Sequence, residues 1–348
     1  MNERDIIRLR LVNQQLTRSD FTDPGALVRW MGCIQAQDYG AAVWAIGNRI
    51  TRIGYSDIER DFNKGRILRT HILRPTWHFI APEDIRWMLK LTGGKVRRIL
   101  QRYLKKTGVE EKDLKLSKKI FEKELAGGRW LTRSTLNEML KSKKINTDEI
   151  RMAFHLMDAE LEGLICSGPR QGKQFTYMLL EERVPAFKPI DGREAVSEMT
   201  KRYFQSRGPA TQKDFCWWSG LSTQEAKLGL EMNEKNMACE KIKGAGYWFY
   251  EGKAQLKTTG IQLLPVYDEY AVGYHDRSAI IHPDHLNLSG SGIFRPVIIH
   301  QGKIAGLWKK IAGKGKIHVE KQLFTPMNQA AAAALEKAEK AYKRFLEN

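Results

Sequence analysis

The stretch LICSGPRQGKQFTYMLL, residues 164–180, decides the fold of this chain. Two apolar runs flank a polar turn that carries Pro169, Gly172 and two basic residues, which is typical of a β-hairpin with a basic tip. Helical patterns precede it at about 132–142 and 148–163, the second opened by a capping sequence. Two helices, the second one long, followed by such a hairpin form the layout of a winged helix.

A similar layout recurs further along the chain. Residues 191–253 contain, in order, a helix at 193–205, capping sequences at 211–214 and 222–225 that open two more helices, and strands at 238–242 and 247–250. The first 80 residues repeat the theme loosely, without a sequence repeat of fixed period. Repeated architecture is therefore expected, and a solenoid is not.

The remaining elements complete the prediction. At the N-terminal end we expect helices at 5–16, 24–36, 41–50 and from 56, a hairpin of 66–73 with 76–80, and helices at 83–91 and 94–106. After about residue 254 we expect strands at 263–267, 279–281, 295–300 and 306–308, then a helix at 328–346.

The predicted fold class is α+β, with tandem winged-helix units (helix-turn-helix plus β-hairpin) and a small C-terminal β domain. The predicted boundaries are 1–128 for a first winged-helix unit with basic helices, 129–190 for a second, 191–253 for a third, and 254–348 for the β domain and its closing helix.

Composition narrows the class of protein. The 348 residues include 58 Lys and Arg against 40 Asp and Glu, a formal net charge of +18. No apolar run approaches a membrane span and the N-terminus lacks a signal-peptide core, so we expect a cytoplasmic protein with no membrane partner. The cysteines, Cys33, Cys166, Cys216 and Cys239, are isolated, which predicts buried reduced thiols and neither disulfides nor a zinc ribbon.

The positive charge is concentrated in two stretches. Residues 90–119 hold eleven basic residues against three acids, and 303–321 hold six lysines against Glu320. Clustered positive charge attracts polyanions by field steering and counterion release, so a nucleic acid is the expected partner. The alternative is a solvated surface that only aids solubility. The candidate phosphate contacts on the helix 94–106 lie mostly off its apolar stripe: Arg97, Arg98, Arg102, Lys105 and Lys106.

Common catalytic and cofactor motifs are missing from the sequence. It contains no GxGxxG, GxxxxGK[ST], GxSxG or HExxH, so we predict no cofactor and no metal. The run His282-Pro283-Asp284-His285 is interpreted as a polar turn. The helix 148–163 is expected to expose His155, Asp158 and Glu162, with Glu160 nearby, and such an acidic face argues against its insertion into the major groove.

The sequence Gln35-Ala36-Gln37-Asp38 at a helix end is the candidate for chemistry. A glutamine cannot act as a general base, but it can hold a water by donating and accepting hydrogen bonds together. That suffices when the leaving group is already good, as an N-alkylated, cationic purine is, and Asp38 could stabilise a cationic sugar. The alternative is two exposed glutamines without a role.

Several motifs together resemble the AlkZ-like family of winged-helix DNA glycosylases, over nearly the whole chain. They are the sequence at 35–38, the stretch 69–79 (RTHILRPTWHF) with Pro82 and Asp84, the stretch 264–270 (LPVYDEY) with Gly273, and 295–297 (RPV) with Gly302 and Gly306. The resemblance implies tandem winged helices around a channel and monofunctional excision of alkylated purines, including unhooking of interstrand crosslinks. It places the family's catalytic QxQ motif on Gln35 and Gln37. Some relatives have aspartate at the second position, whereas glutamine is similar to the crosslink-unhooking branch.

The other candidate residues lie outside this motif. Arg69 and Arg74 on the hairpin are expected to grip phosphates, and His71 and His78 to contact phosphate or orient a water. The alternative is that one histidine is a half-buried structural ring. Two further groups are interpreted as structural. Asp268 or Glu269 is expected to pair with a core arginine such as Arg277 or Arg295. Trp217 and Trp218 are expected in the core, and the alternative is that they stack on an extruded base.

Two other classes of function remain open from the sequence. A non-catalytic regulatory or architectural DNA-binding protein would share the basic surface but not the role of Gln35 and Gln37. A protein-interaction scaffold would use its charge only for solubility, and would fail to bind duplex DNA at moderate salt. No obligate protein partner is evident.

Overall fold

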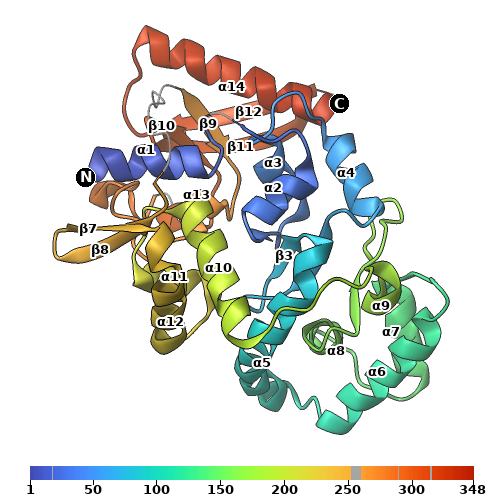
Figure 1. Ribbon diagram of the computed structural model, residues 1–348. Helices are drawn as coiled ribbons and strands as arrows, with labels where there is room; N and C mark the ends of the chain where they lie inside the picture. The colour runs from blue at the N-terminus through green and yellow to red at the C-terminus, as the bar shows by residue number, and fades with distance from the viewer. Residues whose placement is uncertain (18, 252–259, 289, 314–315) are drawn as a thin grey trace. The chain divides into compact units, whose positions relative to one another are not determined.

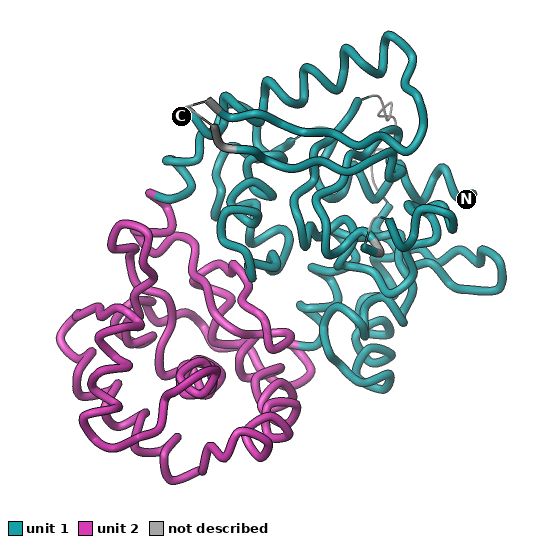
Figure 2. The backbone as a smooth tube through the Cα atoms, turned by 180° about the vertical axis from the view of Figure 1, so that it is seen from behind, with its two compact units in different colours: residues 1–59, 196–348 teal, residues 60–195 magenta. Residues whose placement is uncertain are grey.

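The computed structural model describes residues 1–17, 19–251, 260–288, 290–313 and 316–348. The chain has a mixed α/β architecture with several small sheets (Figure 1). It divides into two compact units: residues 1–59 with 196–348, and residues 60–195 (Figure 2). No helix in the described ranges is both long and apolar enough to cross a bilayer. Lys314 of the second basic stretch and the predicted boundary near residue 254 lie outside the described residues.

The first unit contains a four-stranded antiparallel sheet with a long helix against it. The strand order is β12-β11-β10-β9, and α14 packs against β9 (Figure 1). Aromatic rings join the helix to the rest of this unit: Tyr342 contacts Trp44 and Trp308 at centroid distances of 4.8 and 4.9 Å. The elements are β9 (Ile261–Leu264), β10 (Val297–His300), β11 (Lys303–Gly313), β12 (Lys316–Leu323) and α14 (Gln329–Glu347).

Helices, one short strand and one hairpin make up most of the rest of the first unit. They are α1 (Glu3–Asn13), α2 (Pro24–Trp30), β1 (Ile34–Gln35), α3 (Tyr39–Gly47), α4 (Tyr55–Asn63), α10 (Gly192–Arg207), α11 (Gln212–Ser219), α12 (Thr223–Asn233), β7 (Ala238–Ile242), β8 (Ala245–Phe249) and α13 (Glu269–Val272). Two of these helices, α4 and α10, also include residues of the second unit. The succession α10, α11, α12 and then β7–β8 matches the order predicted for 191–253. The predicted capping boxes at Thr211 and Ser222 are confirmed.

The second unit is built around α8 (Arg151–Leu161). Helices α5 and α6 and strands β2 and β5 all contact α8, which Figure 1 shows end-on among them. The other elements are β2 (Leu68–His71), β3 (Trp77–Ile80), α5 (Pro82–Thr107), α6 (Glu111–Leu125), β4 (Leu131–Thr132), α7 (Arg133–Ser142), β5 (Ile165–Ser167), β6 (Thr176–Leu179) and α9 (Leu180–Arg183). Both predicted hairpins are confirmed, since β2 pairs with β3 and β5 with β6.

Four predicted elements differ from the structure. The helices expected at 83–91 and 94–106 form the single helix α5, because Gly93 lets the carbonyl of Leu161 on α8 approach: a Cβ there would lie 2.7 Å from that oxygen. The helix expected at 24–36 ends at Trp30, where Gly32 takes φ 71°. The apolar run 279–281 is a turn whose isoleucines pack into the core, and β12 was not predicted.

Candidate functional site

The sequence Gln35-Ala36-Gln37-Asp38 forms a turn between β1 and α3. Gln35 is buried, whereas Gln37 and Asp38 are exposed. The Gln37 backbone N–H donates to Oε1 of Gln35 at 3.3 Å. Asp38 caps α3, because its Oδ1 accepts a hydrogen bond from the backbone N–H of Ala41 at 2.9 Å. The turn therefore presents Gln37 and Asp38 on a backbone that is fixed on both sides.

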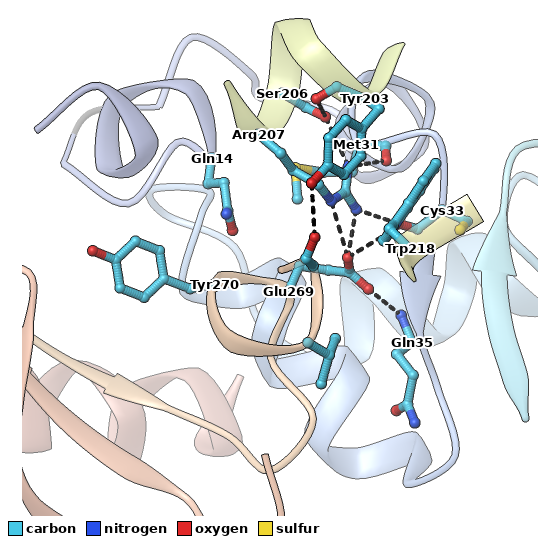
Figure 3. A network of polar contacts seen from close by, with 12 residues as sticks. Gln14, Met31, Cys33, Gln35, Tyr203, Ser206, Arg207, Trp218, Glu269 and Tyr270 are labelled. Carbon is cyan, nitrogen blue, oxygen red and sulfur yellow. Dashed lines mark hydrogen bonds and ion pairs between the residues drawn. The ribbon is translucent and has the colours of Figure 1, made fainter. Parts of the chain in front are cut away.

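A buried carboxylate holds the start of this turn. Glu269, the first residue of α13, accepts the backbone N–H of Gln35 at 2.9 Å through Oε1. Its other oxygen accepts from Nε of Arg207 at 3.1 Å and from Nε1 of Trp218 at 3.1 Å. The amide side chain of Gln35 points away from Glu269 (Figure 3). Glu269 thus fixes the backbone of Gln35 and leaves its side chain outside the network.

The Arg207 guanidinium also holds the chain that leads into the turn. Nη1 donates to the carbonyl oxygen of Met31 at 2.7 Å, and Nη2 donates to that of Cys33 at 3.0 Å (Figure 3). These carbonyls lie on either side of Gly32. Because Arg207 and Glu269 are both fully buried, the pair forms a water-excluded anchor for residues 31–35.

Asp268 makes a second buried ion pair beside the first. Its two oxygens accept from Nη1 and Nη2 of Arg49 at 2.8 and 2.7 Å, a bidentate geometry. The predicted pairing of Asp268 and Glu269 with arginines is confirmed, but the arginines named were wrong. Asp268 and Glu269, at the start of the short helix α13, pair instead with Arg49, which follows α3, and with Arg207 at the end of α10. Arg277 donates to the carbonyl of Ala271 and Arg295 to that of Leu288.

A cavity of about 510 Å³ opens beside Asp38 within the first unit. Lys309 and Lys310 contribute cationic groups to its lining, and Trp44, Tyr55, Trp308 and Tyr342 contribute rings. Burial, followed by the charge of Asp38, raises the pKa of Tyr342 to about 12. The Tyr342 hydroxyl therefore remains a neutral hydrogen-bond donor near the Asp38 carboxylate at physiological pH.

The predicted hairpin residues are mostly buried in the second unit. The Arg69 guanidinium stacks on the rings of Trp77 and Phe175, each 4.4 Å from its centroid. His71 pairs through Nδ1 with Glu160, and the Nδ1–H of buried His78 donates to the carbonyl of Thr76 at 2.9 Å. Arg74, the fourth residue predicted on this hairpin, is partly exposed. These contacts make Arg69, His71 and His78 supports of the hairpin.

The predicted basic residues on α5 divide into two groups. Arg97 makes ion pairs with Asp158 at 2.7 Å, Glu162 at 2.7 Å and Glu111 at 3.4 Å. Burial alone would lower the Arg97 pKa, but these three carboxylates raise it. The others are exposed on the helix surface: Arg98, Arg102, Lys105 and Lys106. Only this second group presents its charge to solvent.

The acidic face predicted for 148–163 is confirmed only for Glu162, which is exposed just beyond α8. His155, Asp158 and Glu160 are buried, because α8 is the central helix of its unit. Asp158 pairs with Arg97 at 2.7 Å and with Lys118 at 2.9 Å, and Glu162 pairs with the same two cations. These two carboxylates therefore neutralise neighbouring cations of their own unit.

Two smaller predictions are only partly right. Trp218 is buried as expected, but Trp217 is 43% exposed and donates through Nε1 to the carbonyl of Val272. Cys33 and Cys166 are buried, whereas Cys216 is intermediate and Cys239 exposed, because β7 leaves much of its length in solvent. The segment 282–285 is a polar turn with a short 3-10 helix at Pro283–His285.

Two comparisons with known proteins both find AlkZ-type DNA glycosylases. A family model described as DNA glycosylase AlkZ-like matches residues 28–345. Among solved structures, the DNA glycosylase AlkZ of Streptomyces sahachiroi is similar in fold, with a TM-score of 0.82 and 21% sequence identity over 99% of this chain and 96% of that chain. A search of curated proteins returned no match.

Proposed function

This chain belongs to the AlkZ-like DNA glycosylase family, and we propose that it is a monofunctional enzyme that excises N-alkylated, cationic purines from double-stranded DNA. The observation that carries the proposal is the turn at residues 35–38. One glutamine is anchored there by its backbone, and the next glutamine and an aspartate are exposed beside it. The two glutamine amides can hold a water, and the Asp38 carboxylate can place negative charge beside the sugar.

The proposed reaction needs little acid catalysis. Alkylation leaves a positive charge on the purine, so the electron pair of the breaking C1′–N bond neutralises the departing base. Gln35 and Gln37 hold a water whose oxygen forms the new bond to C1′, and a proton of that water passes to solvent. The charge of Asp38 stabilises the cationic sugar in the transition state.

The buried anchor gives this mechanism its geometry. Preorganised groups stabilise a transition state because they need no rearrangement as charge develops. Glu269 and Arg207 hold residues 31–35 from within a water-excluded core, and Asp38 is held by its cap on α3. We therefore assign Glu269 and Arg207 as positioning residues and Gln35, Gln37 and Asp38 as catalytic residues.

For the DNA, we propose that the exposed residues of the basic set bind phosphates. These are Arg98, Arg102, Lys105 and Lys106, to which we add the partly exposed Arg74. Arg69, His71 and His78 act indirectly, by holding the β2–β3 hairpin, and Arg97 holds α5 to α8. Removing one exposed phosphate contact is expected to weaken binding to all sequences alike.

We also propose tandem winged-helix units with the boundaries 1–128, 129–190 and 191–253, followed by a β domain. The order of helices and hairpins in the second and third segments supports this division. Interstrand crosslinks are a further proposed substrate, supported by the glutamine at position 37, where some relatives have aspartate.

The test of the proposed function is release of free base from a duplex that carries N7-methylguanine. A monofunctional glycosylase releases the methylated base and leaves an intact strand that breaks only on alkaline treatment. Binding of that duplex without base release, for both methylated and crosslinked substrates, would instead identify a DNA-binding protein without catalytic activity.

A further inference from the structure

Tyr267 has a backbone conformation that aromatic residues rarely adopt. Its φ is 63°, and it is the only aromatic among the seven non-glycine residues with positive φ in the described part of the chain. A bulky side chain at positive φ is a genuine outlier. Such conformations persist only where the surrounding structure enforces them, and they cluster at functional sites.

The neighbours of Tyr267 enforce this conformation from both sides. Its own N–H donates to the carbonyl of Ile293 at 2.9 Å. Asp268 and Glu269 follow directly, and both are locked in buried ion pairs. Val266 precedes it and lines the 510 Å³ cavity. The Tyr267 side chain is only partly buried, so burial of its ring in the core does not offset the free-energy cost of the strained backbone.

An exposed phenylalanine completes an aromatic pair with this tyrosine. Phe294 is 67% exposed, the largest exposed fraction among the large hydrophobic side chains described. Its ring meets that of Tyr267 edge to face, with centroids 6.0 Å apart and planes at 88°. A single exposed apolar residue needs no explanation, but an aromatic pair on a strained backbone does.

Chain neighbours of Tyr267 link the pair to the candidate catalytic turn. Two residues beyond Tyr267, Glu269 holds the backbone of Gln35, and one residue before it, Val266 shares a cavity lining with Asp38. Lys309 and Lys310 line the same cavity. Lys309 pairs with Glu320 at 2.9 Å, so Lys310 is the residue that supplies positive charge for a phosphate. Flat rings and cationic side chains together match the two chemical components of a nucleotide.

We propose that Tyr267 and Phe294 form a stacking platform for a nucleobase of the DNA beside the turn at 35–38. This inference rests on the proposed function and adds a base contact to it. Stacking tolerates any base because each has a π-face, which suits an enzyme that meets its lesion in every sequence context. We infer that the positive φ of the Tyr267 backbone directs its ring toward the turn at 35–38.

The test measures binding and stability without relying on catalysis. The probe is a duplex with a tetrahydrofuran abasic analogue next to 2-aminopurine, whose fluorescence reports stacking. Tyr267→Asn removes the ring and places a residue that tolerates positive φ, so its Tm should equal or exceed that of the wild type. Its affinity for the probe, and that of Phe294→Ala, should fall about 5- to 50-fold.

Two control variants sharpen the interpretation. Tyr267→Phe keeps the ring and should bind as the wild type does. Phe187→Ala removes a phenylalanine that is 42% exposed in the other unit and should leave affinity unchanged. Wild-type affinity and fluorescence in Tyr267→Asn would overturn the proposal, as would a lowered Tm that accounts for the weaker binding. Failure of the wild type to release any base would instead contradict the proposed function, while the probe still tests the platform.

Discussion

At the scale of single residues, the two glutamines of the turn are held differently. Gln35 is buried and fixed through its backbone N–H, whereas Gln37 is exposed. The resemblance to the AlkZ-like family singled out both as candidates, since their residue types and spacing alone left an incidental role open. The sequence could not locate the anchor, because Glu269 lies 234 positions away in the chain and only the folded structure brings the two together.

Substituting Glu269 tests its role as a positioning residue. Glu269→Gln and Asp268→Asn each break one of two adjacent buried ion pairs, so each should lower the free energy of unfolding by about 3–5 kcal/mol. Only Glu269 contacts Gln35, so only Glu269→Gln should lower the excision rate constant, by at least about tenfold.

The measurement is single-turnover excision at a temperature where circular dichroism shows both variants folded. Saturating DNA separates a loss of rate from a loss of binding. Equal losses of rate in the two variants would show that Glu269 contributes only stability.

At the scale of elements, α5 and α8 explain where the sequence misleads. The pair Gly93-Gly94 suggests a helix break, and charged residues on α8 suggest a solvent face, since buried charges are rare unless paired. In the structure Gly93 permits close packing of the two helices, and Asp158 and Glu160 find partners on other elements. The hairpins, the capping boxes at Thr211 and Ser222 and most helices were predictable because their signals are local. The capping sequence expected at 146–149 was wrong, since α8 begins at Arg151 without a side-chain cap.

The two glycines of α5 provide a matched test of this packing. Gly93→Ala places a Cβ 2.7 Å from the backbone oxygen of Leu161 and should lower the free energy of unfolding by about 1–3 kcal/mol. Gly94→Ala meets nothing within 4 Å and should raise it by up to about 1 kcal/mol. Urea denaturation of both variants measures the difference, and a stabilising Gly93→Ala would disprove the close contact.

The basic residues of α5 provide a second test at this scale. Arg102→Gln should reduce the slope of log affinity against log salt by about 0.9 and leave stability unchanged, because Arg102 is exposed. Arg97→Gln should leave the slope unchanged and cost about 1–3 kcal/mol of stability, because it removes a partner of buried Asp158. Salt titrations of duplex binding, with thermal melts, would distinguish the two roles. The reverse pattern would assign phosphate binding to Arg97 and a structural role to Arg102.

At the scale of the whole molecule, charge and fold point to the same class of function. A net charge of +18 favours a polyanionic partner, and membership of the AlkZ-like family makes that partner DNA. The mixed α/β class was predictable from periodicity alone. The two-unit division was not, because residues 1–59 join 196–348 through contacts distant in sequence, such as those of Arg49 with Asp268.

The most direct measurement is release of N7-methylguanine from duplex DNA by the wild type beside Gln37→Ala. Gln37 is exposed, so the variant should fold and bind DNA as the wild type does. We expect base release by the wild type and a loss of at least about 100-fold in the variant. Equal release by both proteins would contradict the assignment of the reaction to the Gln35-Ala36-Gln37 turn.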